Sequence, residues 1–395
     1  MTSARPLHGF ATRAIHAGQE PDAATGSVVT PIYQTSTYKQ DGIGGLRGGY
    51  EYSRSANPTR TALEECVAAL EGGERGYAFA SGLAGQDTVV RALLSHGDHV
   101  VVPSDAYGGT YRYFNKVARP AGITHTIASI HDVDSVRAAI RPGMTKLVWV
   151  ETPTNPLLGI ADIAGIAEVA HAEGALLVVD NTFATSYLQT PISLGADIVT
   201  HSTTKYAGGH SDVIGGVVVV AKDLGAKGFS EVPERIEFHQ NAIGGIAAPF
   251  DSWLVLRGLK TLAIRMEQHC DNAERVVEHL LSHPAVETVY YPGLPEHPGH
   301  LIAAKQMRRF GGMVSISVKG GERAAVAVCG ATQIWTLGES LGGVESLIEH
   351  PARMTHASVS GTPLEVPRNL IRLSVGIEDA DDLIEDLDAA LSAHG

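Results

Sequence analysis

Short aliphatic runs that alternate with amphipathic stretches are the feature that most constrains the fold of this 395-residue chain. The runs are apolar at nearly every position, which is typical of strands buried on both faces of a sheet. Alternation of such strands with helical stretches predicts an α/β fold with a mostly parallel sheet. We expect strands at residues 77–80, 99–103, 146–151, 175–180, 196–202 and 215–221, and helices at 59–71, 82–95, 132–140 and 161–173.

The two ends of the chain follow other patterns. Residues 1–60 are rich in Gly, Pro, Thr and Tyr and show weak hydrophobic periodicity, so we expect an irregular segment there. Asn57 and Pro58 then supply a helix cap and a first-turn proline. Over 250–283 apolar residues recur every three or four positions, which predicts one long helix. We place a domain boundary within that helix or near its start.

Composition excludes several classes of protein. A hydrophobic content of 44% excludes a disordered chain, and a formal charge of −13 argues against broad binding to nucleic acid or anionic membranes. The aliphatic runs are too short to span a bilayer, and the N-terminus lacks the apolar stretch of a signal peptide. The three cysteines show neither disulfide nor zinc spacing, so we expect a reducing cytoplasm and no metal.

Ligands of a parallel sheet bind beyond the carboxyl ends of its strands, where this sequence carries unusual polar residues. The turn SGLAG at 81–85 leads from a strand into a helix, whose free N–H groups could hold an anion; a turn without a ligand is the alternative. Asp180 is the last residue of an apolar strand. Its carboxylate there either pairs with a cation or strong donor, or acts as a capping group. Arg372 lies within an apolar strand, where it needs a ligand anion or a structural salt bridge.

The segment HSTTKYAGGHSD at 201–212 is the most informative. Ser202 and Thr204 project to one side of an extended segment, where their hydroxyls could hold a phosphate beside Lys205. A lysine in a dry pocket loses its proton more readily and forms a Schiff base, whereas a surface lysine in a polar turn would do neither. Together with Asp180 and Arg372, these residues meet the needs of a pyridoxal phosphate enzyme.

Eight segments in a fixed order carry a family resemblance: EYSRSANPTR (51–60), SGLAG (81–85), DAYGGTYR (105–112), VETPTNPLL (150–158), VVDNTFA (178–184), HSTTKYAGGHSD (201–212), GESLGGVESLIEHP (338–351) and RLSVGIED (372–379). Over essentially its whole length the chain resembles the cystathionine γ-synthase/γ-lyase group of the Cys/Met-metabolism pyridoxal-phosphate enzymes. The resemblance implies fold type I, the aspartate-aminotransferase-like fold. It further implies an arm at 1–60 that contacts a neighbouring subunit, a large cofactor-binding domain at 61–255 and a smaller C-terminal α/β domain at 256–395. A homotetramer built from two dimers is the assembly expected.

The resemblance also implies a role for each candidate site residue. Lys205 is expected to carry pyridoxal 5'-phosphate covalently and to act with Tyr107 in proton transfer, while Tyr107 stacks on the cofactor ring. The other cofactor contacts are expected from Asp180 at the pyridine nitrogen, from Gly82, Leu83, Ser202 and Thr204 at the phosphate, from Asn155 near the phenolic oxygen, and from Tyr52 and Arg54 reaching the phosphate of the neighbouring subunit. Substrate binding is expected from Arg372 and Ser340 at the α-carboxylate, from Glu339 at the distal amino group, and from Arg112 and Asn155.

The activity implied is elimination or replacement at the γ-carbon of sulfur amino acids. Cystathionine γ-lyase would cleave cystathionine to cysteine, 2-oxobutyrate and ammonia, whereas cystathionine γ-synthase would join an activated homoserine ester to cysteine; the choice between them stays open. The alternatives within the family are a methionine γ-lyase, an O-acetylhomoserine sulfhydrylase and a cystathionine β-lyase. Methionine γ-lyases usually carry a cysteine where this chain has Gly109. A nucleotide-binding module without pyridoxal phosphate would need a G-x-G-x-x-G turn, which 81–85 does not supply.

Overall fold

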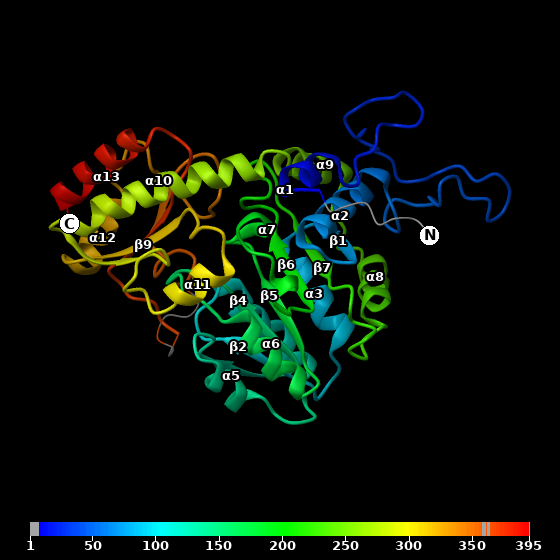
Figure 1. Cartoon of the computed structure of the whole chain (residues 1–395), viewed down its shortest axis with the longest axis horizontal. Coiled ribbons are helices and arrows are strands. Elements are labelled where there is room, and N and C mark those ends of the chain that lie inside the picture. Colours follow the sequence, from blue (N-terminus) through cyan, green and yellow to red (C-terminus); the bar gives the residue numbers. More distant parts are fainter. Residues whose placement is uncertain (1–7, 358–360, 362–363, 395) are drawn as a thin grey trace.

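The structure is a computed structural model that describes residues 8–357, 361 and 364–394. Two sheets form its framework, a seven-stranded sheet in the middle of the molecule and a five-stranded sheet toward the C-terminus (Figure 1). The larger sheet contains, in spatial order, β1 (Arg75–Phe79), β7 (Gly216–Val220), β6 (Ile198–Ser202), β5 (Leu176–Asp180), β4 (Thr145–Glu151), β2 (His99–Pro103) and β3 (Thr124–Ala128). Only β7 runs antiparallel to its neighbours, which confirms the α/β fold with a mostly parallel sheet.

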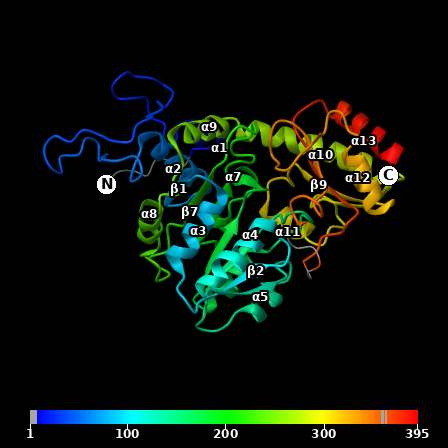
Figure 2. The ribbon, with the colours of Figure 1, turned by 180° about the vertical axis from the view of Figure 1, so that it is seen from behind.

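Alternate residues of the larger sheet pack into helices on its two faces. Along β7, Val217 and Val219 belong to the core beneath α2 (Pro58–Glu71), whereas Val218 and Val220 belong to the core beneath α3 (Gly82–Leu93). On the face of α2 lie also α5 (Val133–Ala139) and α6 (Ile163–Ala172), and the opposite face carries α4 (Gly108–Tyr113) and the π-helical turn Phe114–Ala118 (Figures 1 and 2). Short segments at Arg119–Ala121, α7 (Thr185–Leu188) and Pro191–Leu194, together with α8 (Val232–Ile243), complete this part of the chain.

Local sequence signals explain how these elements begin. The side chain of Asn57 accepts the backbone N–H groups of Thr59 and Arg60 and Pro58 fills the first turn, so α2 starts where the sequence predicts. Strand β3 escaped prediction because it lies at the sheet edge and most of its residues are partly exposed, so it lacks a continuous apolar run. No helix in the described ranges is both long and apolar enough to cross a membrane.

The smaller sheet contains, in spatial order, β10 (Thr336–Leu337), β11 (Leu347–Glu349), β12 (Leu370–Ser374), β9 (Met313–Val318) and β8 (Val286–Tyr290). Its core is shared with α10 (Leu262–Ser282), α12 (Gly321–Cys329) and α13 (Ala380–His394), while α11 (His300–Gln306) lies between the two sheets (Figure 1). The change from one sheet to the other therefore occurs along α10. The domain limits at residues 60 and 255 remain predictions.

The prediction of one long helix over 250–283 was wrong, because the chain forms α9 (Pro249–Leu259) and then α10. The carbonyl oxygen of Gly258 accepts the N–H of Thr261 at 3.2 Å and a guanidinium N–H of Arg265 at 2.7 Å. These donors occupy the acceptor that a continuing helix would use for its own ladder. Apolar periodicity runs through the break, so the sequence pattern did not reveal it.

The N-terminal arm, described from residue 8, contains one short helix, α1 (Phe10–His16), and is otherwise irregular up to α2. Helix α1 packs against α2, and the following loops extend away from the body of the molecule (Figures 1 and 2). The expected irregular segment is therefore present over its described part, and residues 1–7 of the predicted arm lie outside the described residues.

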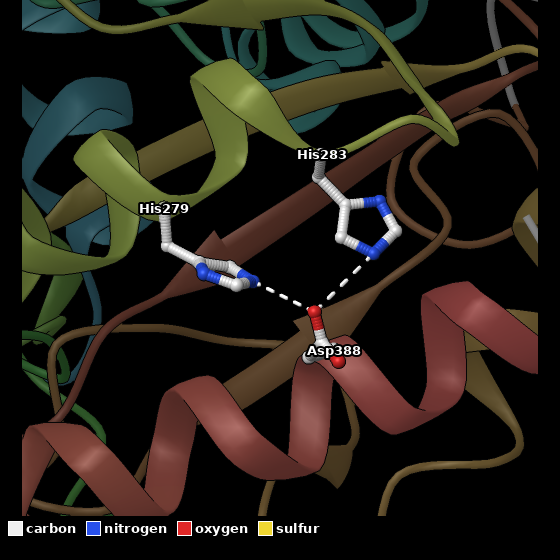
Figure 3. Close-up of side chains that lie close together, drawn as sticks. All are labelled: His279, His283 and Asp388. Carbon is white, nitrogen blue, oxygen red and sulfur yellow. Dashed lines mark hydrogen bonds and ion pairs between the residues drawn. The ribbon is translucent and has the colours of Figure 1, made fainter.

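A cluster of His279, His283 and Asp388 joins α10 to α13 (Figure 3). The Nε2 atoms of the two histidines lie 3.0 and 3.4 Å from one carboxylate oxygen of Asp388, a spacing that a metal ion could also bridge. However, Nδ1 of His283 accepts the backbone N–H of Ala285, so the proton of the neutral ring lies on Nε2, the atom that faces Asp388. Hydrogen bonds between the two helices account for this cluster.

Candidate active site

A cavity of ≈ 270 Å³ lies at the carboxyl ends of β5 and β6 and receives residues from the smaller sheet. It brings together most of the predicted site residues: Gly82, Leu83, Tyr107, Asn155, Asp180, Ser202, Thr204, Lys205, Glu339, Ser340 and Arg372. The position agrees with the rule that ligands of parallel sheets bind beyond the strand ends. The individual roles of these residues stay predictions, but their convergence on one cavity is a property of the fold.

One end of the cavity is built by the first turn of α3. The side chain of Ser81 accepts the N–H of Ala84, which leaves the N–H groups of Gly82 and Leu83 among the first-turn donors that this cap does not use. A Cβ at Gly82 would lie only 3.2 Å from Cβ of Ser202, so glycine allows the helix to approach β6 closely. The helix dipole adds positive charge at this end, which suits a phosphate.

The cavity wall also contains buried polar atoms that lack a partner in the described structure. They are Oγ1 of Thr200, Nε1 of Trp149 and Nε2 of Gln86. Such orphaned groups are costly unless a ligand or water satisfies them. Pyridoxal phosphate carries polar groups that could bind the unpartnered atoms of this wall, and a phosphate that could accept the N–H groups in the first turn of α3. These residues therefore fit the expected cofactor.

Asp180 ends β5 beside the cavity. One of its carboxylate oxygens accepts the N–H of Thr182 at 3.0 Å, and no lysine or arginine forms an ion pair with it among the described residues. Loss of solvent raises its pKa, against the lowering effect of the Thr182 hydrogen bonds. A protonated ring nitrogen would supply the missing positive partner, so the environment of Asp180 also fits the cofactor.

Glu151 is a site residue that the sequence reasoning missed. It ends β4 directly opposite Asp180 in the parallel register and is buried. Its carboxylate accepts the backbone N–H groups of Tyr107 and Asn155, both at 3.0 Å, and thereby holds two loops of the cavity in place. Burial and the neighbouring Asp180 raise the pKa of Glu151. The run KLVWVE ends in a carboxylate as LLVVD does, so the same signal could have found it.

Lys205 lies in the turn after β6 and is largely desolvated. Its Nζ donates to Oγ of Ser340 at 2.7 Å. Ser340 has φ +87°, a left-handed conformation that is rare for a serine and that brings its hydroxyl to the lysine. Burial and the nearby Arg372 lower the pKa of Lys205 to about 8. The amine therefore loses its proton much closer to neutral pH than an ordinary lysine, and the reaction of Lys205 with a cofactor stays a prediction.

Arg372 lies in β12 and is only 2% exposed. Its Nη1 lies 2.9 Å from Glu349 and donates to Oδ1 of Asn155 at 2.9 Å, while Nη2 donates to the Ser340 carbonyl at 2.6 Å. Arg372 therefore forms a structural salt bridge, one of its two alternatives; it also lines the cavity, and its binding of a ligand anion stays a prediction. Its Nε has no partner in the described structure. Glu349 stands directly opposite Arg372 in the antiparallel register of β11 and β12, and the sequence reasoning did not single it out.

Tyr107 lies at the start of α4 with 40% of its surface exposed. Its ring lies over Gly109, where a Cβ would come within 2.2 Å of Cε1 of Tyr107. The glycine that distinguishes this chain from the methionine γ-lyase pattern is thus required by the observed position of the tyrosine ring. A side chain at residue 109 would force the ring to move.

Three predicted site residues lie outside the cavity. Arg112 is exposed on α4 and does not line the cavity wall. Tyr52 and Arg54 are exposed in the N-terminal arm, where the Arg54 guanidinium lies 5.6 Å from the centre of the Tyr52 ring. This chain alone does not bring these residues to its own cavity, and their expected roles stay predictions.

Comparison with known proteins agrees with the geometry. Residues 11–392 match the model of the family described as Cys/Met metabolism PLP-dependent enzyme. The cystathionine gamma-synthase of Mycobacterium tuberculosis is 56% identical over 390 residues, which cover 99% of this chain and 98% of the relative. The cystathionine gamma-lyase of Bacillus subtilis is 53% identical over 384 residues, which cover 96% of this chain and 98% of the relative.

Solved structures agree as well. The structure of metB from Corynebacterium glutamicum is 54% identical with a TM-score of 0.94, and the match covers 98% of each chain. This likeness confirms the expected fold, with a larger mostly parallel sheet and a second smaller sheet. The family match over nearly the whole chain and the high identities show that this protein is an enzyme of the Cys/Met metabolism PLP-dependent family.

Proposed function

We propose that the enzyme joins an activated homoserine ester to cysteine and so forms cystathionine, the cystathionine γ-synthase reaction. The observation that carries the proposal is that Lys205, Arg372 and Glu339 line one cavity, where both charged groups act on the Lys205 amine. A cation and an anion in one cavity with a reactive amine suit a substrate with a carboxylate near the reacting carbon and an amino group at its far end. The 56% identity to a cystathionine gamma-synthase supports the same reaction.

Cleavage of cystathionine by γ-elimination is the second candidate. It is favoured by the 53% identity to a cystathionine gamma-lyase and by the fact that both reactions use the same residues around the γ-carbon. In the synthase reaction the ester group leaves the γ-carbon and the cysteine thiol adds there, whereas in the lyase reaction cysteine leaves and the unsaturated product is released and hydrolysed to 2-oxobutyrate and ammonia. The balance is therefore a matter of relative rates in one site.

Several residues of this chain would hold the cofactor. The N–H groups of Gly82 and Leu83 with the hydroxyls of Ser202 and Thr204 would bind the phosphate, and Asp180 would bind the ring nitrogen. Bound pyridoxal phosphate supplies an electron-withdrawing ring that stabilises negative charge on substrate carbons. Arg372 donates to Oδ1 of Asn155 and so fixes the orientation of this amide. The donor atom Nδ2 of Asn155 therefore points away from Arg372.

Lys205 would move protons between substrate carbons. A pKa of about 8 allows this amine to accept a proton and to return it near neutral pH. Ser340 holds Nζ of Lys205 through its hydroxyl and Nη2 of Arg372 through its carbonyl, so one residue fixes the distance between the base and the carboxylate site. Tyr107 at the open side of the cavity would assist proton transfer, and Glu339 would bind the distal amino group.

The proposed assembly is a homotetramer of two close dimers, and its proposed location is the cytoplasm. Each chain would consist of an arm at 1–60, a large domain at 61–255 and a small domain at 256–395. Exposed Tyr52 and Arg54 on an arm that extends from the body support their reaching the cofactor phosphate of a neighbouring subunit. Arg112 is exposed. Its proposed contact with Glu339 or with the distal carboxylate of the substrate would therefore form in the ligand-bound enzyme.

Two measurements test the proposed function. Borohydride reduction of the yellow holoenzyme should fix the cofactor on the peptide that contains Lys205, and K205A should remain unlabelled. The kcat/KM for an activated homoserine ester with cysteine should exceed that for cystathionine alone. A larger value for cystathionine, with 2-oxobutyrate as product, would assign the γ-lyase reaction instead, and pyruvate as the product would assign β-elimination.

A further inference from the structure

A buried arginine lies beneath the part of the N-terminal arm that carries Tyr52 and Arg54. Arg60, in the first turn of α2, is only 1% exposed. Its Nη1 donates to the backbone carbonyl of Ser53 at 2.7 Å, and its Nη2 donates to that of Arg54 at 3.1 Å. A guanidinium removed from water is costly unless its N–H groups find acceptors. Arg60 finds two of these acceptors in the backbone of the arm.

The carboxylate that pairs with Arg60 is engaged elsewhere. Oε1 of Glu64 lies 3.6 Å from Nε of Arg60, which is too far for a hydrogen bond. The same oxygen accepts the backbone N–H of Ala78 at 2.9 Å and Nε2 of Gln240 at 3.1 Å. Glu64 therefore balances the charge of Arg60 but leaves both of its Nη atoms to the arm.

The backbone beneath the side chains of Tyr52 and Arg54 is held at three successive carbonyls, although this part of the arm is irregular. The carbonyl of Tyr52 accepts the N–H groups of Ser55 and Ala56 at 3.0 and 3.1 Å, and the next two carbonyls accept from Arg60. A loop whose carbonyls bonded only to water would sample many conformations, and ordering it would cost free energy for every residue fixed. Arg60 thus fixes the turn from which these two side chains extend.

The side chains of Tyr52 and Arg54 are exposed and lie together. The Arg54 guanidinium lies 5.6 Å from the centre of the Tyr52 ring, and no carboxylate within the described ranges forms an ion pair with it. The stem of Arg54 rests on the end of α8, where a Cβ at Gly244 would lie 3.4 Å from Cδ of Arg54. A guanidinium and a phenol hydroxyl offer N–H and O–H donors that suit a phosphate. The pair therefore has the donor chemistry that the proposed phosphate contact requires.

We propose that Arg60 is a positioning residue, which fixes the arm backbone and thereby presents Tyr52 and Arg54 to the cofactor phosphate of a neighbouring subunit. The inference rests on the proposed function, in which Tyr52 and Arg54 reach that phosphate. Because the turn is ordered before the phosphate binds, the affinity is not reduced by the cost of ordering it. Arg60 itself does not touch the cofactor, so its effect falls on the neighbouring subunit's site and not on the site of its own subunit.

The first test measures the dissociation constant of pyridoxal phosphate from the apoenzyme by quenching of protein fluorescence. R54M removes a proposed phosphate donor and should raise this constant at least about tenfold. R60M leaves the donors in place but frees the turn, and should raise it about three- to tenfold. R137M, at an exposed arginine of α5 paired with Asp134, is the control and should match the parent. A constant that rises in R54M but stays at the parent value in R60M would overturn the proposal.

A combination of substitutions separates positioning from general stability. In Y52F/R54M the arm lacks both proposed phosphate donors, so the further change R60M should alter the dissociation constant less than about twofold. If Arg60 only stabilised its own subunit, R60M would weaken binding by the same factor in both backgrounds, and that result would contradict the proposal. R60K, which keeps the charge and one donor group, should lie between R60M and the parent. It provides the same comparison if R60M does not fold.

Hybrid enzymes show on which subunit Arg60 acts. R60M is co-expressed with K205A under different affinity tags, and the hybrids are purified through both tags. In a hybrid dimer the R60M subunit keeps Lys205 and receives the unaltered arm of the K205A subunit. The activity at limiting pyridoxal phosphate should therefore exceed that of either variant alone. No gain here, with a gain when R54M replaces R60M, would assign Arg60 to its own subunit and refute the inference. No gain with R54M either would refute the intersubunit contact of the proposed function itself.

Discussion

Replacement of Arg372 by lysine tests the substrate role of the most buried cation in the cavity. The guanidinium spans three fixed partners, with Nη1 at 2.9 Å from both Glu349 and Asn155 and Nη2 at 2.6 Å from the Ser340 carbonyl. Nε is buried and has no partner in the described structure. A lysine amine is a single point charge, so it cannot bridge these partners and also present two parallel N–H groups to a carboxylate.

The expected loss follows from the number of contacts. If R372K forfeits one charge-assisted hydrogen bond to the substrate carboxylate, the loss is about 1.5–3 kcal/mol. At about 1.4 kcal/mol per factor of ten, kcat/KM should fall roughly 10- to 150-fold, mostly through a higher KM. The assay is steady-state turnover of cystathionine and of the ester with cysteine. R368K, at an exposed arginine paired with Glu365, is the matched control and should behave as the parent. An unchanged kcat/KM in R372K would refute the reasoning.

Three further perturbations have expected outcomes. G109A should lower kcat at least several-fold, because a Cβ would come within 2.2 Å of the Tyr107 ring; a fully active G109A would show that the ring position is not needed. The rate at which apoenzyme takes up pyridoxal phosphate should rise with pH and level off near pH 8, because the unprotonated amine of Lys205 reacts and its pKa is about 8; a rise continuing toward the ordinary value of 10.5 would contradict this. N57A should destabilise the protein by about 1 kcal/mol through loss of the α2 cap, seen as a lower midpoint in urea, whereas an unchanged midpoint would argue against the cap.

The fold was predictable where a local pattern determines the element. Continuous apolar runs identified all strands of the larger sheet except β3, and the cap at Asn57 located α2. The break between α9 and α10 was not predictable, because it depends on Arg265 reaching the carbonyl of Gly258 rather than on the residues at the break. Hydrophobic periodicity reports which face is buried, and that face continues across both helices.

The residues of the candidate site were likewise predictable only where a local sequence pattern pointed to them. Lys205 and Asp180 follow apolar strands directly, so the rule about strand ends led to them. Glu151 obeys the same rule, and the structure shows that this second carboxylate at a neighbouring strand end holds two loops of the cavity. Residue type and local position therefore indicate where the site lies before they indicate what each residue does there.

Glu349 illustrates the information that only three-dimensional pairing supplies. Its segment holds several glutamates, and nothing in the local sequence distinguishes the one that matters. It becomes significant because the register of β11 and β12 sets it opposite Arg372, and because the next turn returns Thr355 to the same carboxylate. A one-residue change of register would turn Glu349 to the other face of the sheet and leave Arg372 buried without a counter-ion, at a cost of several kcal/mol. The ion pair therefore helps to select the register of the smaller sheet, and the same register delivers Arg372 to the cavity.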